Sequence, residues 1–358
     1  MSGKKKTLPD PQPTREEWQH LYAAAQTFKE AVPWETMTEE QIFGVRDPES
    51  GQIGYCSITG LLGEHLALII YEGEVGLGCY YAMIHQHDHA RGYLQEREAG
   101  FALLETPQLQ ASFEDRAELD NLDHQVIKML GLRFRGQQAW PRFRHYQPGR
   151  HPWFVTAPQA RFLTLALEQA LVAIDEIDEA PDFLLAEMGD APVLLLRAQE
   201  NEEWHSNWEV VEPVYPAYRL DVDEAPFVAA RRDLPVRAAR MQVHLAMMGG
   251  GIEEDLPPYF PYLLLLVEAD SGYVFGQDLM LARPSVESLL AEIPTRFLAQ
   301  LYALRMRPEE VIVASERLYQ LLAVPLSYMG IRLSRVDSLP MLEEALISLE
   351  EWLMGTGT

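Results

Sequence analysis

The spacing of apolar residues predicts a helix near the start of the chain, followed by three strands and a second helix. Residues 14–17 (TREE) have the S/T-x-x-E form of a capping box, which satisfies the first free N–H groups of a helix. The apolar residues that follow recur at spacings of three and four: Trp18, Leu21, Tyr22, Ala25 and Phe28. Two alternating runs flank a Pro/Gly turn at 47–51 and predict a hairpin. Residues 65–73 predict a third strand, and residues 74–84 a helix.

The middle of the chain predicts a long helix and a hairpin. Residues 156–159 (TAPQ) form a second capping signal, with proline tolerated in the first turn, and the helix continues to about residue 177. Residues 191–214 read as two strands joined by an acidic turn. Residues 140–154 (WPRFRHYQPGRHPWF) are rich in Pro, Gly and Arg, which indicates an ordered but irregular crossing between domains.

The last third has the clearest pattern. It predicts, in order, a strand at 240–248, a hairpin at 262–281, a helix at 285–306 kinked near Pro294, a strand at 309–315, a helix at 316–330, a strand at 331–337 and a helix at 341–354. A strand and a hairpin followed by alternating helices and strands predict an α/β domain with a mixed sheet. The part of the chain before it is expected to be α+β.

These patterns divide the 358 residues into four parts. They are a flexible tail at 1–13, an N-terminal α+β domain at 14–148, a middle α+β segment at 149–235 and a C-terminal α/β domain at 236–358. The patterns leave open whether the middle segment folds with the part before it or with the part after it.

The charge of the chain argues against some functions. Its 54 Asp and Glu residues outnumber 29 Lys and Arg residues, which gives a formal net charge of −25. Such a polyanion repels phosphate backbones, so we do not expect a nucleic-acid partner. No apolar run approaches the ~20 residues that span a bilayer, and the first residues lack a secretory signal, so no membrane partner is expected. The two cysteines match no metal or redox motif, and this fits a cytoplasmic protein.

Three histidines lie close together in the sequence, at His85, His87 and His89. Imidazole is a common zinc ligand, and on a helix His85 and His89 would share one face. The alternative is a solvated helix end, at which positive side chains oppose the helix dipole. We favour the helix end, because two histidines four residues apart lack the other ligands of a zinc site.

A second candidate site combines arginines with aromatic side chains between residues 142 and 153. Its members are Arg142, Arg144, Tyr146, Arg150 and Trp153. Such side chains suit contact with a peptide, a carboxylate or a nucleic acid. The alternative is an internal clasp between domains, with the tryptophan buried and the arginines paired to acids. In a chain this acidic we favour the clasp.

Most of the chain resembles a group of bacterial proteins built from paired domains of unknown function. The resemblance rests on the amino-acid sequences of residues 33–77, residues 112–119 (SFEDRAEL) and residues 140–154. No activity is established for that group, so the resemblance implies an organisation and no chemistry.

From residue 240 the order of elements resembles the RNase H-like fold of integrases and transposases. Matching pieces are residues 241–244 (MQVH), 267–273 (VEADSGY) and 314–317 (ASER). The aspartates that the resemblance implies fall on His244 and Ser315, which cannot supply the carboxylates of a two-metal site. Glu268, Asp270 and Glu316 are the nearby acids that a rearranged site could use.

Three functions therefore stay open. We favour a non-catalytic protein whose acidic faces and Arg-aromatic junction bind another protein, with no cofactor. The second is a metal-dependent hydrolase or nuclease that uses an atypical acidic site in the C-terminal domain. The third is a metal or small-molecule sensor that uses the histidines. The sequence does not indicate an oligomeric state.

Overall fold

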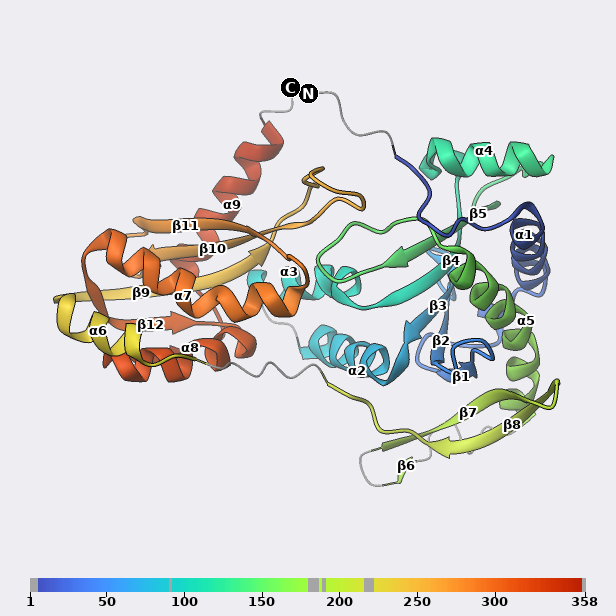
Figure 1. Ribbon diagram of the computed structural model, residues 1–358, viewed down its shortest axis with the longest axis horizontal. Coiled ribbons are helices and arrows are strands. Elements are labelled where there is room, and N and C mark those ends of the chain that lie inside the picture. Colours follow the sequence, from blue (N-terminus) through green and yellow to red (C-terminus); the bar gives the residue numbers. More distant parts are fainter. Residues whose placement is uncertain (1–5, 90–91, 180–186, 189–190, 216–221, 356–358) are drawn as a thin grey trace. The chain divides into compact units, whose positions relative to one another are not determined.

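The chain divides into two compact units in the computed structural model, and each unit is described by itself (Figure 1). The described residues are 6–89, 92–179, 187–188, 191–215 and 222–355. The first unit contains residues 1–82, 104–147 and 152–216, and the second contains residues 83–103, 148–151 and 217–358. Each unit is built on a mixed sheet with helices packed against it.

The sheet of the first unit has eight strands. They are β1 (Phe43–Arg46), β2 (Ile53–Thr59), β3 (Leu66–Glu72), β4 (Gln108–Glu114), β5 (Trp140–Tyr146), β6 (Glu187–Met188), β7 (Ala191–Glu200) and β8 (Glu203–Val210). The order is β5-β4-β3-β2-β1-β7-β6, and β8 pairs with β7. Strands β2 to β5 form an antiparallel meander, while β1 is antiparallel to β2 and parallel to β7.

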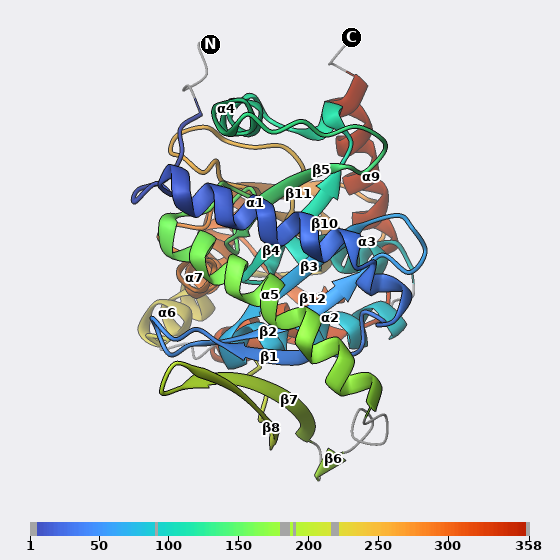
Figure 2. The same cartoon turned by 90° about the vertical axis from the view of Figure 1, so that its right-hand side faces the viewer.

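Helices α1 (Arg15–Glu30) and α5 (Ala157–Glu179) pack against each other over one face of this sheet (Figure 2). The capping box predicted for α1 is present, because Thr14 Oγ1 accepts from Glu17 N and the Glu17 carboxylate accepts from Thr14 N. The core beneath the two helices contains stacked rings of Phe28 and Phe113, with centroids 6.4 Å apart. Shorter helices of the chain are η1 (Pro33–Glu35), η2 (Leu103–Glu105), η3 (Arg116–Glu118) and α4 (Asn121–Leu130).

The opposite face of the first sheet meets the beginning of α2 (Gly73–His89), which confirms the helix predicted there. Leu77 and Tyr80 of α2 are buried, and the rings of Tyr71 and Tyr80 lie 4.9 Å apart. This face also carries the even-numbered residues of β4, which are polar and buried. Their hydrogen bonds matter for the site described below.

The sheet of the second unit has five strands, β9 (Val236–Met247), β10 (Pro261–Glu268), β11 (Val274–Leu281), β12 (Arg307–Val313) and β13 (Arg332–Arg335). Their order is β11-β10-β9-β12-β13. Strands β9, β10 and β11 form an antiparallel meander, whereas β12 is parallel to both β9 and β13. The prediction of a mixed sheet in an α/β domain is confirmed.

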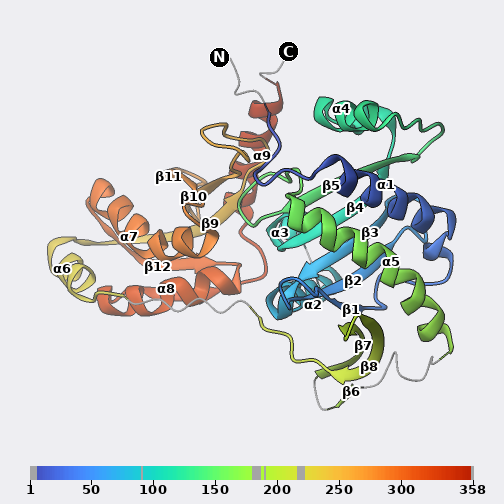
Figure 3. The same ribbon diagram turned by 45° about the vertical axis from the view of Figure 1, so that its right-hand side comes forward.

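Helices cover both faces of the second sheet. They are α3 (Tyr93–Ala102), α6 (Ala225–Asp233), α7 (Val286–Leu304), α8 (Glu316–Met329) and α9 (Pro340–Gly355). Leu263 shares a core with Leu342 of α9 and Leu94 of α3. The next residue, Leu264, pairs with Asp278, which contacts Arg296 of α7. Since successive side chains of a strand point to opposite faces, α9 and α7 lie on opposite sides of the sheet (Figure 3).

The helices and strands predicted for the last third of the chain are confirmed, including the helix that contains Pro294. The crossing predicted at residues 140–154 is wrong for its first half, because Trp140–Tyr146 is strand β5 at the edge of the first sheet. The alternation of apolar and polar residues along β5 is interrupted by Arg142 and Arg144, which contact acids within the first unit. Residues 1–5 of the predicted tail lie outside the described residues, and Pro11 O accepts a hydrogen bond from Ala157 N at 2.7 Å.

Each compact unit is assembled from several stretches of the chain. Most of the middle segment belongs to the first unit, because β7 pairs with β1 and α5 covers the first sheet. Helix α3 belongs to the second unit although it lies within the predicted N-terminal domain. Its Leu94 is buried in the second core, and its Arg97 donates to Glu350 Oε1 at 2.8 Å and to Met247 O at 2.6 Å.

Candidate functional site

Arg144 of the predicted Arg-aromatic site is held by internal partners. Its side chain is 3% exposed, and its two terminal nitrogens donate to both carboxylate oxygens of Asp123 at 2.9 and 2.7 Å. A third bond reaches Asp120 at 3.2 Å, and the guanidinium lies 4.4 Å from the centre of the Phe154 ring. This arginine ties α4 to the edge of the sheet and has no free face for a partner.

The other four residues of that candidate site are divided between the two units. Tyr146 and Trp153 are buried in the first unit, whereas Arg150 belongs to the second. Arg150 donates to Pro257 O at 2.9 Å and to the hydroxyl of Tyr259. Arg142 is 26% exposed and makes one long contact, 3.5 Å, with Glu114. Arg142 and Arg144 contact acids and Trp153 is buried, while the clasp between domains stays a prediction.

The histidine segment is helical to His89, as predicted, so His85 and His89 are four residues apart on α2. The side chain of His85 is exposed, while the side chains of His87 and His89 lie outside the described residues, so their part in a metal site is not described. Among the side chains that the structure describes, no group of three or more His, Cys, Asp or Glu residues is placed to hold a metal ion.

The acids named in the C-terminal domain have local structural partners. Glu268 accepts from the backbone N–H groups of Asp270 and Ser271 at 3.0 and 2.5 Å. A hydrogen bond from the Ser271 side chain, followed by these two backbone bonds, holds the pKa of Glu268 below its usual range. Asp270 lies 3.6 Å from Arg240, and Glu316 pairs with Arg335. Asp278, a further acid of this domain, pairs with Arg296 at 3.5 Å. Asp270, Glu316 and Asp278 therefore each contact a different arginine.

An acidic pocket of about 490 Å³ opens between two turns of the first unit. It is lined by Thr38, Glu39, Glu40, Thr59, Gly60, Leu61, Leu62, Glu64 and His65. Leu61 and Leu62 are 62% and 86% exposed, and Glu39, Glu40 and Glu64 are exposed as well. Two apolar side chains therefore stand in water among three carboxylates, a combination that suits a docking surface better than a simple turn.

The first wall of the acidic pocket is fixed by buried hydroxyls. The carbonyl oxygen of Glu39 accepts from Ser57 Oγ at 2.7 Å and from the Tyr80 hydroxyl at 3.0 Å. Ser57 and Tyr80 are buried on β2 and α2, and so their hydroxyls need a partner. Both bonds hold residues 38–40 in place while leaving the Glu39 side chain in solvent.

The second wall is fixed by Gln138. Its side-chain amide donates to the carbonyl oxygens of Gly63 and Glu64 at 2.9 and 3.1 Å. Gln138 is held in turn, because its N–H donates to Asp115 at 2.7 Å and Lys29 donates to its carbonyl oxygen. The turn that carries the two exposed leucines is therefore positioned by a hydrogen-bond network.

His65, at the end of the second wall, is joined to the polar row of β4. Its Nε2 lies 2.7 Å from Gln110 Nε2, and the Tyr146 hydroxyl donates to Gln110 Oε1 at 2.6 Å. Tyr146 thus contributes to the acidic pocket indirectly, by orienting Gln110. Gln110 was not among the residues predicted from the sequence, although the polar alternation of QLQASFE on a strand buried on both faces is a signal for it.

Glu114 and Glu118 form a carboxyl pair close to His65, and this pair carries negative charge. Burial acts to raise the pKa of Glu114, but hydrogen bonds from Ser112 and Glu118 and the charge of Arg142 outweigh burial, so this pKa is lowered. The pKa of Glu118 is raised because its carboxyl is hydrogen-bonded to Glu114 and faces the charge of Glu114. When the two share one proton, it resides on Glu118, and Glu114 stays ionised.

Two family models match the chain. Residues 18–195 match a domain of unknown function, DUF7309, and residues 230–350 match another domain of unknown function, DUF6930. The two matches are adjacent, which confirms the expected organisation as a pair of uncharacterised domains, and the acidic pocket lies within the first. No curated protein matches the chain. Within the described part of the chain, no helix combines the length and apolar character needed to cross a bilayer.

Proposed function

We propose that this is a non-catalytic protein-interaction protein, and that it binds a basic and apolar segment of another protein at the acidic pocket. The observation that carries the proposal is the pair of exposed leucines, Leu61 and Leu62, among three exposed glutamates. Lysine or arginine side chains of a partner would meet the carboxylates, and an apolar side chain would cover the leucines. The proposed site is thus one of the acidic faces expected from the sequence, and the Arg-aromatic residues 142–153 are not part of it.

The rigidity of the two walls supports the proposal. Binding is weakened when loops and side chains must be ordered on contact, and preorganised surfaces avoid that loss. Residues 38–40 and 63–65 are held by Ser57, Tyr80, Gln138 and Gln110 before any partner arrives. Buried polar groups are expensive to keep in a core, and their use as supports for this pocket gives a reason for their presence.

The net charge of −25 supports a basic partner in a second way. A strongly negative protein attracts cationic segments from a distance of about one Debye length, ~10 Å at 0.1 M salt, and speeds their association. Three carboxylates at a single pocket then favour one docking position over diffuse contact. The leucines add an apolar contribution that salt does not screen.

Fluorescence anisotropy with labelled nine-residue peptides tests this proposal on the full chain. We expect a peptide of alternating Lys and Leu to bind saturably, and peptides with Glu for Lys or Ser for Leu to bind more weakly. The variant E39Q/E40Q/E64Q should lose at least about tenfold in affinity, since several exposed ion pairs of modest strength are removed together. The variant L61S/L62S should also bind more weakly, with little change in salt dependence.

A matched control removes the same charge elsewhere. Glu200, Glu202 and Glu203 are exposed at the β7–β8 turn, and E200Q/E202Q/E203Q changes the net charge by the same amount as the pocket variant. We expect this control to bind the Lys-Leu peptide almost as the natural protein does. Equal loss in the control and in the pocket variant would mean diffuse charge attraction, and the pocket would not be the site.

We propose further that the second unit has an RNase H-like fold without nuclease activity. Support for the fold comes from the central β9, with an antiparallel meander on one side and parallel strands β12 and β13 on the other. Support for inactivity comes from Glu268, Asp270 and Glu316, whose carboxylates have other partners. We expect no cleavage of DNA or RNA with Mg²⁺ or Mn²⁺. Metal-dependent cleavage that is lost in E268A, D270A or E316A would contradict this.

A cytoplasmic location is part of the same proposal. Cys56 and Cys79 form no disulfide, and burial raises the pKa of the Cys56 thiol far above its usual range, which keeps it protonated. Thiols in this state are usual in a reducing compartment. Cell fractionation that found the protein with secreted material would contradict the location.

A further inference from the structure

We infer that the acidic pocket binds residues 4–8 (KKKTL) of a second copy of this chain. The inference rests on the proposed function and names its partner. Residues 4–8 are called the lysine arm below. The chain has only five lysines, Lys4, Lys5, Lys6, Lys29 and Lys128, and three of them are consecutive in this arm. Leu8 follows two residues after the last of them, so the arm combines the positive charge and the apolar side chain that the pocket fits.

The lysine arm has the reach to contact a neighbouring molecule. Within the described residues, the first backbone hydrogen bond is at Pro11, whose carbonyl oxygen accepts from Ala157 N, and Pro13 is buried. The residues before Pro11 lie in no helix or strand where they are described. The seven residues from Lys4 to Asp10 span at most about 25 Å when extended. Pro9 and Pro11 restrict the backbone and favour an extended segment, which lowers the entropy lost on docking.

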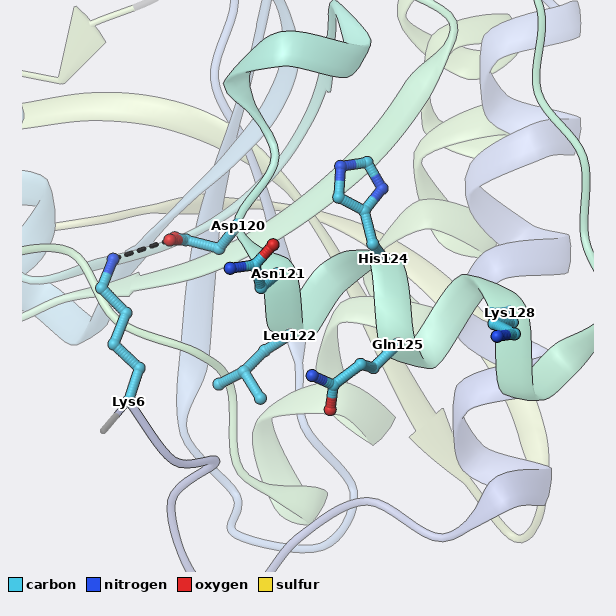
Figure 4. Close-up of a pocket in the computed structure, with 7 residues that line it drawn as sticks. All are labelled: Lys6, Asp120, Asn121, Leu122, His124, Gln125 and Lys128. Carbon is cyan, nitrogen blue, oxygen red and sulfur yellow. Dashed lines mark hydrogen bonds and ion pairs between the residues drawn. The ribbon is translucent and has the colours of Figure 1, made fainter.

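In its own chain, Lys6 lies at a different place from the acidic pocket. Figure 4 shows its amine joined to Asp120 at the start of α4, at 2.7 Å. A pocket of about 520 Å³ at this place is lined by Lys6, Asp120, Asn121, Leu122, His124, Gln125 and Lys128. The Lys6–Asp120 pair is exposed on both sides, 49% and 32%, and exposed pairs of this kind contribute little to stability. Lys6 can therefore leave Asp120 at low cost.

The carboxylates available to the arm favour a second copy. At its own site Lys6 meets one carboxylate, Asp120, which it shares with Arg144. The acidic pocket of a neighbour offers three exposed carboxylates, those of Glu39, Glu40 and Glu64, together with two leucines for Leu8. Two molecules of charge −25 repel each other, but this repulsion is screened beyond about 10 Å at 0.1 M salt, whereas the contact pairs lie within that range.

The contact joins unlike surfaces, because the arm of one molecule enters the pocket of another. Such a heterologous contact lets two variants complement each other. The arm variant K4Q/K5Q/K6Q keeps its pocket, and the pocket variant E39Q/E40Q/E64Q keeps its arm. Each alone should associate only weakly, whereas their mixture should form a one-to-one dimer that cannot grow further.

Analytical ultracentrifugation of the full chain tests this inference. We expect the natural protein to associate as its concentration rises, each variant to associate at least about tenfold more weakly, and the mixture to recover a dimer. Association should be lost at roughly 1 M NaCl, where the Debye length is about 3 Å. A monomeric natural protein at all concentrations, or a mixture that stays monomeric, would overturn the inference.

A peptide titration separates this inference from the proposed function. The labelled peptide GKKKTLPDP, residues 3–11, is titrated into the arm variant, which has no competing lysines of its own. Saturable binding that is lost with GQQQTLPDP and weakened with GKKKTSPDP supports the inference. If the Lys-Leu peptide binds and GKKKTLPDP does not, the arm is not the partner, although the pocket still binds basic segments. If neither binds, both proposals fail. If GKKKTLPDP binds while the natural protein stays monomeric, the arm docks within its own chain and the second copy is excluded.

Discussion

Replacing Arg144 with methionine is expected to lower the free energy of unfolding by about 3–5 kcal/mol, as found when one partner of a buried ion pair is removed. The guanidinium is the charged partner of Asp123, whose side chain is 7% exposed, and it makes two hydrogen bonds to that carboxylate. Methionine would leave the Asp123 charge buried with no counter-charge. The loss should appear in urea unfolding followed by circular dichroism, as a lower midpoint.

Two further variants identify the cause of that loss. Arg142 lies on the same strand, but it is 26% exposed and has one contact of 3.5 Å, so R142M should cost less than about 1 kcal/mol. The double variant D123N/R144M removes both charges and should recover a large part of the stability lost in R144M. Equal losses in R142M and R144M would mean that the buried ion pair does not stabilise the edge of the sheet.

The stability of the protein is expected to fall between pH 6.5 and about 3 because of His244. Burial, with the nearby charges of Arg97 and Arg317, lowers the pKa of this imidazole from its usual 6.5 to about 3. Glu98 lies 3.7 Å from Nε2, but the neutral ring forms no ion pair with it. Below pH 6.5 the unfolded chain binds a proton at His244 that the folded chain does not. The folded protein therefore has its full unfolding free energy above pH 6.5. As the pH falls below this value, the unfolding free energy decreases by up to about 1.4 kcal/mol per pH unit because of His244.

The variant H244L isolates this effect. Leucine has a similar size and no proton to bind, and within the described residues neither ring nitrogen of His244 has a hydrogen-bond partner to lose. The difference in unfolding free energy between H244L and the natural protein should grow by up to about 2.7 kcal/mol between pH 6.5 and 4.5. The variant H205L, at an exposed histidine, is the matched control for the loss of an imidazole. Parallel curves for H244L and the natural protein would show that His244 does not titrate differently in the two states.

Short-range signals predicted the elements well, because the information needed for each lies within a few residues. The capping box at residues 14–17 and the apolar spacing after it define α1, and the Pro/Gly turn at 47–51 defines the hairpin of β1 and β2. In the last third, a strand, a hairpin and alternating helices were enough to predict a mixed sheet with covering helices. Strand β5 was not predicted, because its arginines interrupt the alternation of apolar and polar residues that indicates a strand. In the structure the buried Arg144 of this strand is paired with Asp123.

The acidic pocket could be predicted only in part. Two leucines followed by a glutamate at 61–64 are visible in the sequence, but the turn at 38–40 that completes the pocket is more than twenty residues away. The candidate residues Arg142, Arg144, Tyr146, Arg150 and Trp153 were grouped because they are close in sequence. Strand pairing assigns them to different units. Tyr146 pairs with Gln108 in the sheet of the first unit, whereas Arg150 forms a β-bridge with Tyr259 in the second unit.

By itself, the sequence determined most of the helices and strands, the acid excess and the chemical character of each segment, because backbone propensity, capping and charge are properties of neighbouring residues. Only the tertiary structure decided that α3 completes the second core, that β7 from the middle segment joins the first sheet, and that Gln110 and Gln138 hold the acidic pocket. These outcomes depend on which buried surfaces and unpaired polar groups find partners across long separations in the chain. Burial and hydrogen-bond satisfaction are settled only when the whole of each unit is packed.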